Sequence, residues 1–151
     1  MKKLLIIIAL ALVAVACQDN KVRHVQKVDC YYIESGLPWE IHYYDVVGTD
    51  STWVEVKMFH ENGVLELEGK IVNNQREGEF RGYFPTGELM SVGSYVNGKR
   101  EGKGKLYYDN GQVFVENEYC NDEPCGTWRM YDEYGNLLKE GNYKDVLSLF
   151  R

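Results

Sequence analysis

Residues 83–102 read YFPTGELMSVGSYVNGKREG, and this stretch decides the fold because its pattern recurs every 24 residues. Six columns of residues keep that spacing: Gly63, Gly87, Gly111 and Gly135; Phe59, Tyr83, Tyr107 and Tyr131; Ile71, Tyr95, Tyr119 and Tyr143; Leu65, Leu89, Val113 and Leu137; Gly69, Gly93 and Gly141, interrupted by Asn117; and Gly78, Gly102 and Gly126. A period held in register along much of a chain indicates a repeat architecture.

Each repeat has the pattern of a β-hairpin. In the unit 103–126, residues 104–108 are expected to form a strand, Asp109-Asn110-Gly111 a turn, and residues 113–116 the start of the return strand. Asn110-Gly111 favours a turn here, because asparagine and glycine readily adopt the positive φ values that tight hairpin turns require. A second turn is expected to join successive units, at residues 96–102 and at 120–125.

Polarity alternates along the return strands. Leu65, Leu67 and Ile71 fall on one face, and Glu66, Glu68 and Lys70 fall on the other. Alternation of this kind is typical of an antiparallel sheet with one apolar and one solvated face. We therefore predict an all-β protein: an elongated antiparallel meander, or solenoid, of about four 24-residue β-hairpin repeats with atypical terminal caps.

The pattern resembles the MORN repeat, in particular its bacterial variant. The resemblance rests on an aromatic residue, a turn with glycine, an apolar residue, Gly-x-Tyr and then Asn-Gly-Lys-x-x-Gly, as in residues 83–102, and it covers 57–145. The unit beginning at Tyr107 departs from it, with Asn117 in place of glycine and Cys-Asn-Asp-Glu-Pro-Cys in place of the Asn-Gly turn. Bacterial proteins with this repeat are often grouped with YwqK-type antitoxins, so the resemblance implies a binding function and suggests an immunity role.

The regions outside the repeats are expected to differ from them. Residues 30–56 are interpreted as a degenerate N-terminal repeat or cap, because Gly36 and Trp53 keep the 17-residue spacing of Gly111 and Trp128. Residues 17–29 are interpreted as a tether, and residues 146–151 as a C-terminal cap over the last hairpin, because uncovered sheet edges promote aggregation.

The N-terminus has the pattern of an export signal. Two lysines precede the unbroken apolar run of residues 4–16. As a helix the run would extend about 20 Å, too short for a hydrocarbon core of about 30 Å. We interpret residues 1–16 as a signal peptide. Ala14-Val15-Ala16-Cys17 resembles the lipobox of bacterial lipoproteins, apart from Ala14 where leucine is usual.

Two fates of the exported chain follow from this motif. Lipidation of Cys17 would anchor the protein to a membrane through its acyl chains, and Gln18, where some lipoproteins have aspartate, is compatible with the outer membrane. The alternative is ordinary cleavage after Ala16, which gives a soluble secreted or periplasmic protein. Export also permits disulfides: Cys120 and Cys125 are one candidate pair, free thiols remain an alternative, and Cys30 could pair with Cys17 if Cys17 is not lipidated.

Charge and motifs argue against several functions. Without residues 1–16 the chain keeps 15 basic against 23 acidic residues, a formal charge near −8. This balance disfavours nucleic acid and favours a basic protein partner. His24, His42 and His60 have no metal-type spacing, and pairs such as Glu66 and Glu68 are typical of a solvated strand. We expect no enzyme activity, no metal and no cofactor.

Function is therefore expected to reside in a binding surface. Both aromatic columns are interpreted mainly as core, with part of one exposed as a contact surface, because tyrosine and tryptophan are favoured at protein interfaces. The candidate partner-binding residues are Trp39, Trp53, Tyr83, Tyr107, Trp128 and Tyr131. The leading hypothesis is an envelope lipoprotein that binds another protein. The alternatives are a structural or assembly accessory factor of the envelope and a lipid-binding repeat protein.

Overall fold

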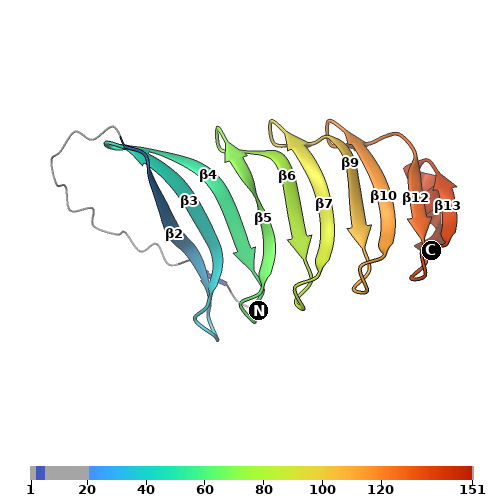
Figure 1. The fold of residues 1–151 in the computed structure, drawn as a ribbon, viewed down its shortest axis with the longest axis horizontal. Coiled ribbons are helices and arrows are strands. Elements are labelled where there is room, and N and C mark those ends of the chain that lie inside the picture. The colour runs from blue at the N-terminus through green and yellow to red at the C-terminus, as the bar shows by residue number, and fades with distance from the viewer. Residues whose placement is uncertain (1–2, 6–20, 151) are drawn as a thin grey trace.

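A computed structural model describes residues 3–5 and 21–150, which form one continuous antiparallel sheet followed by a short helix (Figure 1). The strands that follow the main path of the sheet are β1 (Lys3–Leu5), β2 (Arg23–Tyr32), β3 (Pro38–Val47), β4 (Asp50–Phe59), β5 (Leu65–Val72), β6 (Gln75–Tyr83), β7 (Leu89–Val96), β9 (Gly102–Tyr107), β10 (Val113–Cys120), β12 (Trp128–Tyr131) and β13 (Leu137–Gly141). Two-residue strands β8 (Lys99–Arg100) and β11 (Glu123–Pro124) pair with β7 and β10. The chain ends in α1 (Tyr143–Leu147) and the 3-10 helix η1 (Ser148–Phe150).

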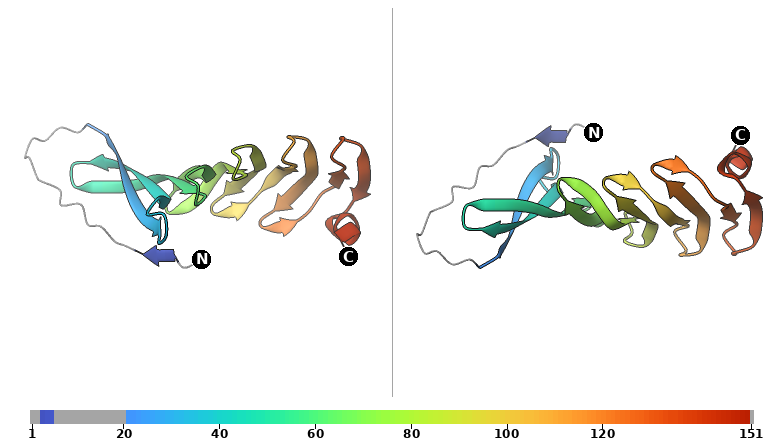
Figure 2. Two further views of the ribbon diagram at one scale, coloured as in Figure 1. Left: turned by 90° about the horizontal axis from the view of Figure 1, so that it is seen from below. Right: turned by 90° about the horizontal axis from the view of Figure 1, so that it is seen from above.

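The strands lie in the sheet in chain order, so every neighbour on the main path is also the next strand along it. This is the all-β, elongated hairpin meander that the 24-residue period predicts. The four repeats are the hairpins β4–β5, β6–β7, β9–β10 and β12–β13. Figure 2 shows these hairpins succeeding one another along the molecule, which is the arrangement of a solenoid.

The two kinds of turn differ from the sequence expectation in one respect. Within the third unit, Tyr108 and Gln112 pair through their backbones, and only Gly111 of the Asn-Gly pair has positive φ, at 83°. That is a three-residue loop with a left-handed third residue. The turns with two consecutive positive φ values instead join the units, at Asn73-Asn74, Asn97-Gly98 and Asn121-Asp122. Asparagine and aspartate tolerate this conformation, so the turn forms without glycine.

A bulge recurs at the same position of all four hairpins. The pairing slips by one residue after Met58, Gly82, Leu106 and Met130, in each case just before the aromatic residue that ends the outgoing strand. A β-bulge adds one residue to one strand and reverses which face the following side chains take. The extra residue lies in the return strand, between Leu65 and Leu67 in the first hairpin and between Leu89 and Ser91 in the second, so the alternation of faces is interrupted there and not at the aromatic column.

The N-terminal hairpin β2–β3 behaves as an atypical fifth unit. The Tyr32 hydroxyl donates to the Phe59 carbonyl at 2.9 Å, as the Tyr108 hydroxyl donates to the Tyr131 carbonyl in the third unit. Its loop is longer, since Tyr32 pairs with Leu37 where Tyr108 pairs with Gln112. One expectation needs correction here: residues 23–29, interpreted as part of a tether, belong to β2 and pair with β3. Unlike residues 57–145, this stretch carries no recognisable repeat, so its strand character was missed.

Burial is concentrated in two small clusters because the sheet is a single layer. The first contains Val56, Ile71 and Phe80, with Trp53 and Tyr95 among the residues packed around them. The second contains Val115, Trp128, Met130 and Val146. Val146 is fully buried on α1, so the helix covers the apolar face at the C-terminal end, as the predicted cap does (Figure 2).

Part of the predicted N-terminal segment is described. β1 (Lys3–Leu5) pairs with β2, placing Lys3 opposite Tyr32 and Leu5 opposite Cys30. The rest of the predicted signal peptide and Cys17, the predicted lipidation site, lie outside the described residues.

Candidate binding surface

The two faces of the sheet differ in chemistry. We call the face that carries Val56, Phe80 and Trp128 the apolar face, and the face that carries Glu68, Lys105 and Glu116 the charged face. Residues paired across neighbouring strands share a face, so Gly69, Gly93 and Asn117 belong to the apolar face with Phe80 and Gly104. The sequence alternation of Leu67 and Glu68 predicted this division.

The charged face is a ladder of ion pairs that runs across the strands. Glu116 on β10 accepts from Lys105 at 3.0 Å and lies 3.7 Å from Arg129, which reaches Glu140 at 3.1 Å. The hydrogen bond from Lys105 is the main cause that lowers the pKa of Glu116. Lys57 lies 3.8 Å from Glu68. Because acid and base alternate, this face presents no extended field of a single sign.

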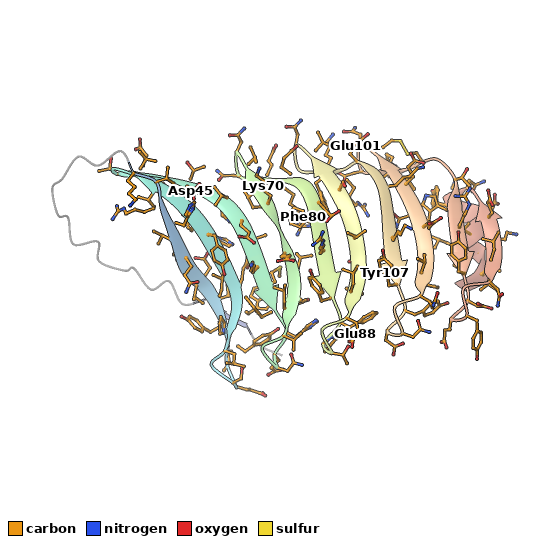
Figure 3. All side chains as sticks on the ribbon, in the orientation of Figure 1. Asp45, Lys70, Phe80, Glu88, Glu101 and Tyr107 are labelled. Atoms are coloured by element: carbon orange, nitrogen blue, oxygen red, sulfur yellow. A yellow bond between two sulfur atoms is a disulfide. The ribbon has the colours of Figure 1, made fainter. Side chains whose placement is uncertain are left out.

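The first aromatic column supports that ladder. The Tyr83 hydroxyl donates to Glu68 at 2.7 Å, and the Tyr131 hydroxyl donates to Glu116 at 3.2 Å. Burial raises the pKa of both phenols, and the hydrogen bonds to the carboxylates raise it further. Tyr107 is half-buried in the same column (Figure 3). The hydroxyls of Tyr83 and Tyr131 are thus engaged within the sheet, although both residues were expected to contact a partner.

The apolar face carries a second column whose importance the sequence did not reveal. Val56, Phe80, Gly104 and Trp128 succeed one another at intervals of 24 residues. The Phe80 ring lies over Gly69, where a Cβ atom would fall 2.4 Å from two of its ring carbons. It makes an edge contact with Tyr95 at 5.0 Å between centroids, and the Arg76 guanidinium covers both rings at 5.0 and 5.2 Å. Large and small residues therefore interlock across β5, β6 and β7.

The third unit reverses this arrangement. Gly104 stands where Phe80 stands one unit earlier, and its cross-strand partner is Asn117, in the column otherwise made of glycine. A Cβ on Gly104 would lie 2.6 Å from Asn117 Oδ1 and 2.9 Å from the Val92 carbonyl oxygen. The interruption at Asn117 is therefore matched by an interruption at Gly104. Lys103-Gly104-Lys105 was the sequence signal for it, because alignment at 24 residues sets Gly104 against phenylalanine and tryptophan.

A groove results on the apolar face between the second and third units, with a volume of about 220 Å³. Gly93 and Gly104 form part of its lining, together with Phe80, Tyr95, Leu106 and Tyr119. Arg100 also lines it, with its guanidinium 4.0 Å from the Tyr119 ring centroid. The α1 helix covers the fourth unit, and among the described residues no helix covers this groove (Figure 2).

The tryptophans take three different environments. Trp128 was expected to contact a partner, and this is corrected: its side chain is buried, with 4% exposure, and its indole N–H donates to the Glu118 and Cys125 carbonyls. It fills the Phe80 position of the last unit, where it packs against Val115 and Val146. Trp53 is half-buried and stacks on His42 at 4.2 Å. Trp39 is half-buried on β3.

The histidines serve local contacts. His42 contacts Glu40 at 2.7 Å and Asp29 at 2.6 Å, and His60 Nε2 lies 2.8 Å from the Tyr83 carbonyl oxygen. His24 pairs with Asp45 at the exposed end of β2. In residues 3–5 and 21–150, no three histidine, cysteine, aspartate or glutamate side chains gather as a metal site would require.

Cys120 and Cys125 are joined by a disulfide, with their Cα atoms 5.8 Å apart. The bond spans the turn at Asn121-Asp122 and the short strand β11. This turn joins the third and fourth units. The turns that join the other repeats, at Asn73-Asn74 and Asn97-Gly98, carry no disulfide. Cys30 is buried on β2. No helix in the described part of the chain is long and apolar enough to cross a membrane.

The fold and these surfaces define an open hairpin-repeat protein with one apolar and one charged face. Comparison with family models assigns it further: a model of the MORN repeat matches residues 92–113, and a model of the MORN repeat variant matches residues 54–73, 76–97 and 124–145. The matches together cover more than half of the chain, which therefore belongs to the MORN-repeat family. The variant model matches the first, second and fourth units and leaves out the third, where Gly104 and Asn117 depart from the pattern.

Other comparisons add little. No curated protein matches the sequence. Among solved structures, the chain is similar to one in a crystal structure of the GtfA/B complex bound to UDP and GlcNAc, with 13% identity, a TM-score of 0.29, and coverage of 87% of this chain and 24% of that one. It is also similar to TarM, with 12% identity, a TM-score of 0.31, and coverage of 88% and 23%. The chain thus spans about a quarter of the length of these proteins, and such slight likeness supports no functional argument.

Proposed function

We propose that this chain is a protein-binding repeat module of the bacterial cell envelope. The observation that carries the proposal is the apolar face of the second and third units, which leaves aromatic side chains and a groove beside them outside the cover of α1. An apolar surface of this kind on a single-layer sheet is typical of a site that a partner protein covers. The proposal assigns the chain a binding role and no catalytic step.

The anchoring part of the proposal rests on the sequence. The apolar run of residues 4–16 followed by Cys17 supports export and attachment of lipid to Cys17. Metabolic labelling with an alkyne fatty acid tests it directly. The wild-type protein is expected to be labelled and to sediment with membranes, whereas Cys17→Ala abolishes both. A labelled Cys17→Ala variant, or an unlabelled wild-type protein, would contradict lipidation of this residue.

Within this role, an immunity function is the finer proposal, supported by the acidic balance of the chain, which favours a basic partner. A basic toxin would then be blocked by equimolar amounts of the protein. Recovery of envelope-assembly proteins instead would favour the alternative of an accessory factor. Inhibition assays with the recovered partner separate the two.

The experiment that tests protein binding is cross-linking in intact envelopes with a matched pair of variants. Leu106→Arg places a charge on the apolar face, and Val72→Arg places the same charge on the other face, at side chains of similar exposure, 36% and 38%. We expect Leu106→Arg to lose the cross-linked partner and Val72→Arg to retain it. No partner with the wild-type protein, or equal recovery with both variants, would count against the proposal.

A further inference from the structure

The groove over Gly93 lies where the repeat pattern would place the side chain of residue 104. Phe80 leans over Gly69, so a residue at position 104 with the same geometry would lean over Gly93, which is 24 residues beyond Gly69. Position 104 is glycine, and a Cβ atom on Gly93 would meet no atom within 4 Å. The neighbouring units thus show what fits here, because each holds an aromatic ring at the equivalent place: Phe80 in the second unit (Figure 3) and Trp128 in the fourth.

The groove is lined by residues equivalent to those that surround Phe80 one unit earlier. In the second unit a ring lies beside Tyr95 and beneath the Arg76 guanidinium. In the third unit Tyr119 and Arg100 occupy the corresponding columns, with the guanidinium 4.0 Å from the Tyr119 ring centroid. A guanidinium attracts the electronegative face of an aromatic ring, so Arg100 makes the groove electrostatically complementary to one.

Two further features define the ligand. The Asn117 side chain lines the groove and makes no side-chain hydrogen bond with the described residues, so its amide can serve a polar group of a ligand. The volume of about 220 Å³ is smaller than the roughly 300–1,000 Å³ of pockets for drug-sized molecules. It suits one large side chain.

We propose that this groove binds an aromatic side chain with a polar edge, tryptophan or tyrosine, presented by a partner protein. The inserted ring would lie on Gly93, beside Tyr119 and beneath Arg100, and its polar group would face Asn117. It would restore the interlocked column that Gly104 interrupts. Buried aromatic anchors of this kind dominate the energetics of many protein interfaces. The inference rests on the proposed binding function and names the chemistry of its contact.

The test uses N-acetyl-tryptophanamide and N-acetyl-tyrosinamide as probes, with N-acetyl-leucinamide for comparison, and follows backbone amide signals of the full exported chain by NMR. Saturable shifts are expected at Gly93, Gly104 and Tyr119 with both aromatic probes, and at least a fivefold weaker response with the leucine probe. Gly93→Phe fills the groove with a ring of its own and should abolish the response. Val72→Phe adds the same ring to the charged face and should preserve it.

The NMR experiment can contradict the groove assignment independently of the result of the envelope cross-linking. Absence of saturable shifts, equal response to the leucine probe, or an unchanged response in Gly93→Phe would overturn the groove assignment even if a partner is recovered through Leu106. The inserted ring could also come from a second copy of this chain, because Tyr134 is 87% exposed. Light scattering tests this by measuring whether the protein forms a dimer. A dimer lost in both Gly93→Phe and Tyr134→Ala would replace the partner protein with a second copy.

Discussion

The Phe80 ring covers Gly69 on the adjacent strand so closely that a Cβ atom on Gly69 would fall 2.4 Å from two ring carbons. One repeat later, Gly93 occupies the same column and lies uncovered. The difference comes from Gly104, which replaces the aromatic residue that would otherwise cover Gly93. Equivalent glycines of consecutive repeats therefore have opposite tolerance for a side chain.

Alanine at these two glycines tests the difference. Gly69→Ala forces the buried Phe80 ring to move, and overpacking of this kind typically costs about 1–3 kcal/mol of unfolding free energy. Gly93→Ala meets no atom within 4 Å and should change stability by less than about 1 kcal/mol, with a gain from reduced unfolded-state entropy. Chemical denaturation of both variants measures this, and equal losses would contradict the packing of Phe80 over Gly69.

The buried indole of the fourth unit should be a main source of C-terminal stability. Trp128 packs with Val115, Met130 and Val146, so Trp128→Ala is expected to cost about 3–5 kcal/mol. Tyr134→Ala, at an 87% exposed turn residue, is the control and should stay within about 0.5 kcal/mol. Hydrogen exchange should show the loss first in β12 and α1, because each repeat depends mainly on its neighbours. Uniform loss along the array would contradict this local coupling.

The 24-residue columns were sufficient to predict the meander, its hairpins and its two unlike faces, because Leu67 and Glu68 already alternate in the sequence. Three features were not predictable by that route. The bulge before Tyr83 depends on pairing between strands, which alternation within one strand does not contain. Residues 23–29 pair through their backbones and show no repeat. The burial of Trp128 becomes clear only when it is aligned with Phe80 and seen beneath Val146.

The groove was missed for a related reason. Asn117 was recognised as a break in the glycine column, but a break in one column says nothing about the residue across the sheet. Register places Gly104 opposite Asn117, so the two exceptions form one exchange of large and small positions. The space over Gly93, in the second unit, is then explained by the missing side chain of Gly104, in the third unit.

Loss of the disulfide should weaken the joint between the third and fourth units. A cross-link that closes so short a loop contributes about 2 kcal/mol by restricting the unfolded chain. Cys120→Ser combined with Cys125→Ser should lose about that much unfolding free energy. Dithiothreitol should destabilise the wild-type protein by a similar amount and leave the double variant unchanged. A response of the double variant to the reductant would assign the effect to another cysteine.

The carboxylate of Glu116 should make the stability of the sheet depend on pH on the acidic side. Its pKa is lowered from the ordinary value of 4.5, chiefly by the hydrogen bond from Lys105 and then by that from Tyr131. A carboxyl whose pKa is lower in the folded state stabilises the fold at pH values above its unfolded pKa, and the contribution disappears as the pH falls through the folded pKa. Glu116→Gln removes the charge and should therefore lower stability near pH 7.

The decisive measurement is the difference in unfolding midpoint between wild type and Glu116→Gln as the pH is lowered. That difference should be largest near neutrality and begin to shrink as the pH falls to 4.5, where the unfolded carboxyl takes up a proton. It should vanish below the lowered pKa of the folded state, where the wild-type carboxyl is protonated as well. Glu123→Gln, at an exposed residue of the joining turn, controls for the general effect of removing one negative charge and should show little difference at either pH. A Glu116→Gln deficit that persists unchanged at low pH would mean that the glutamate acts through packing, and the ion-pair ladder of the charged face would then contribute nothing to stability through Glu116.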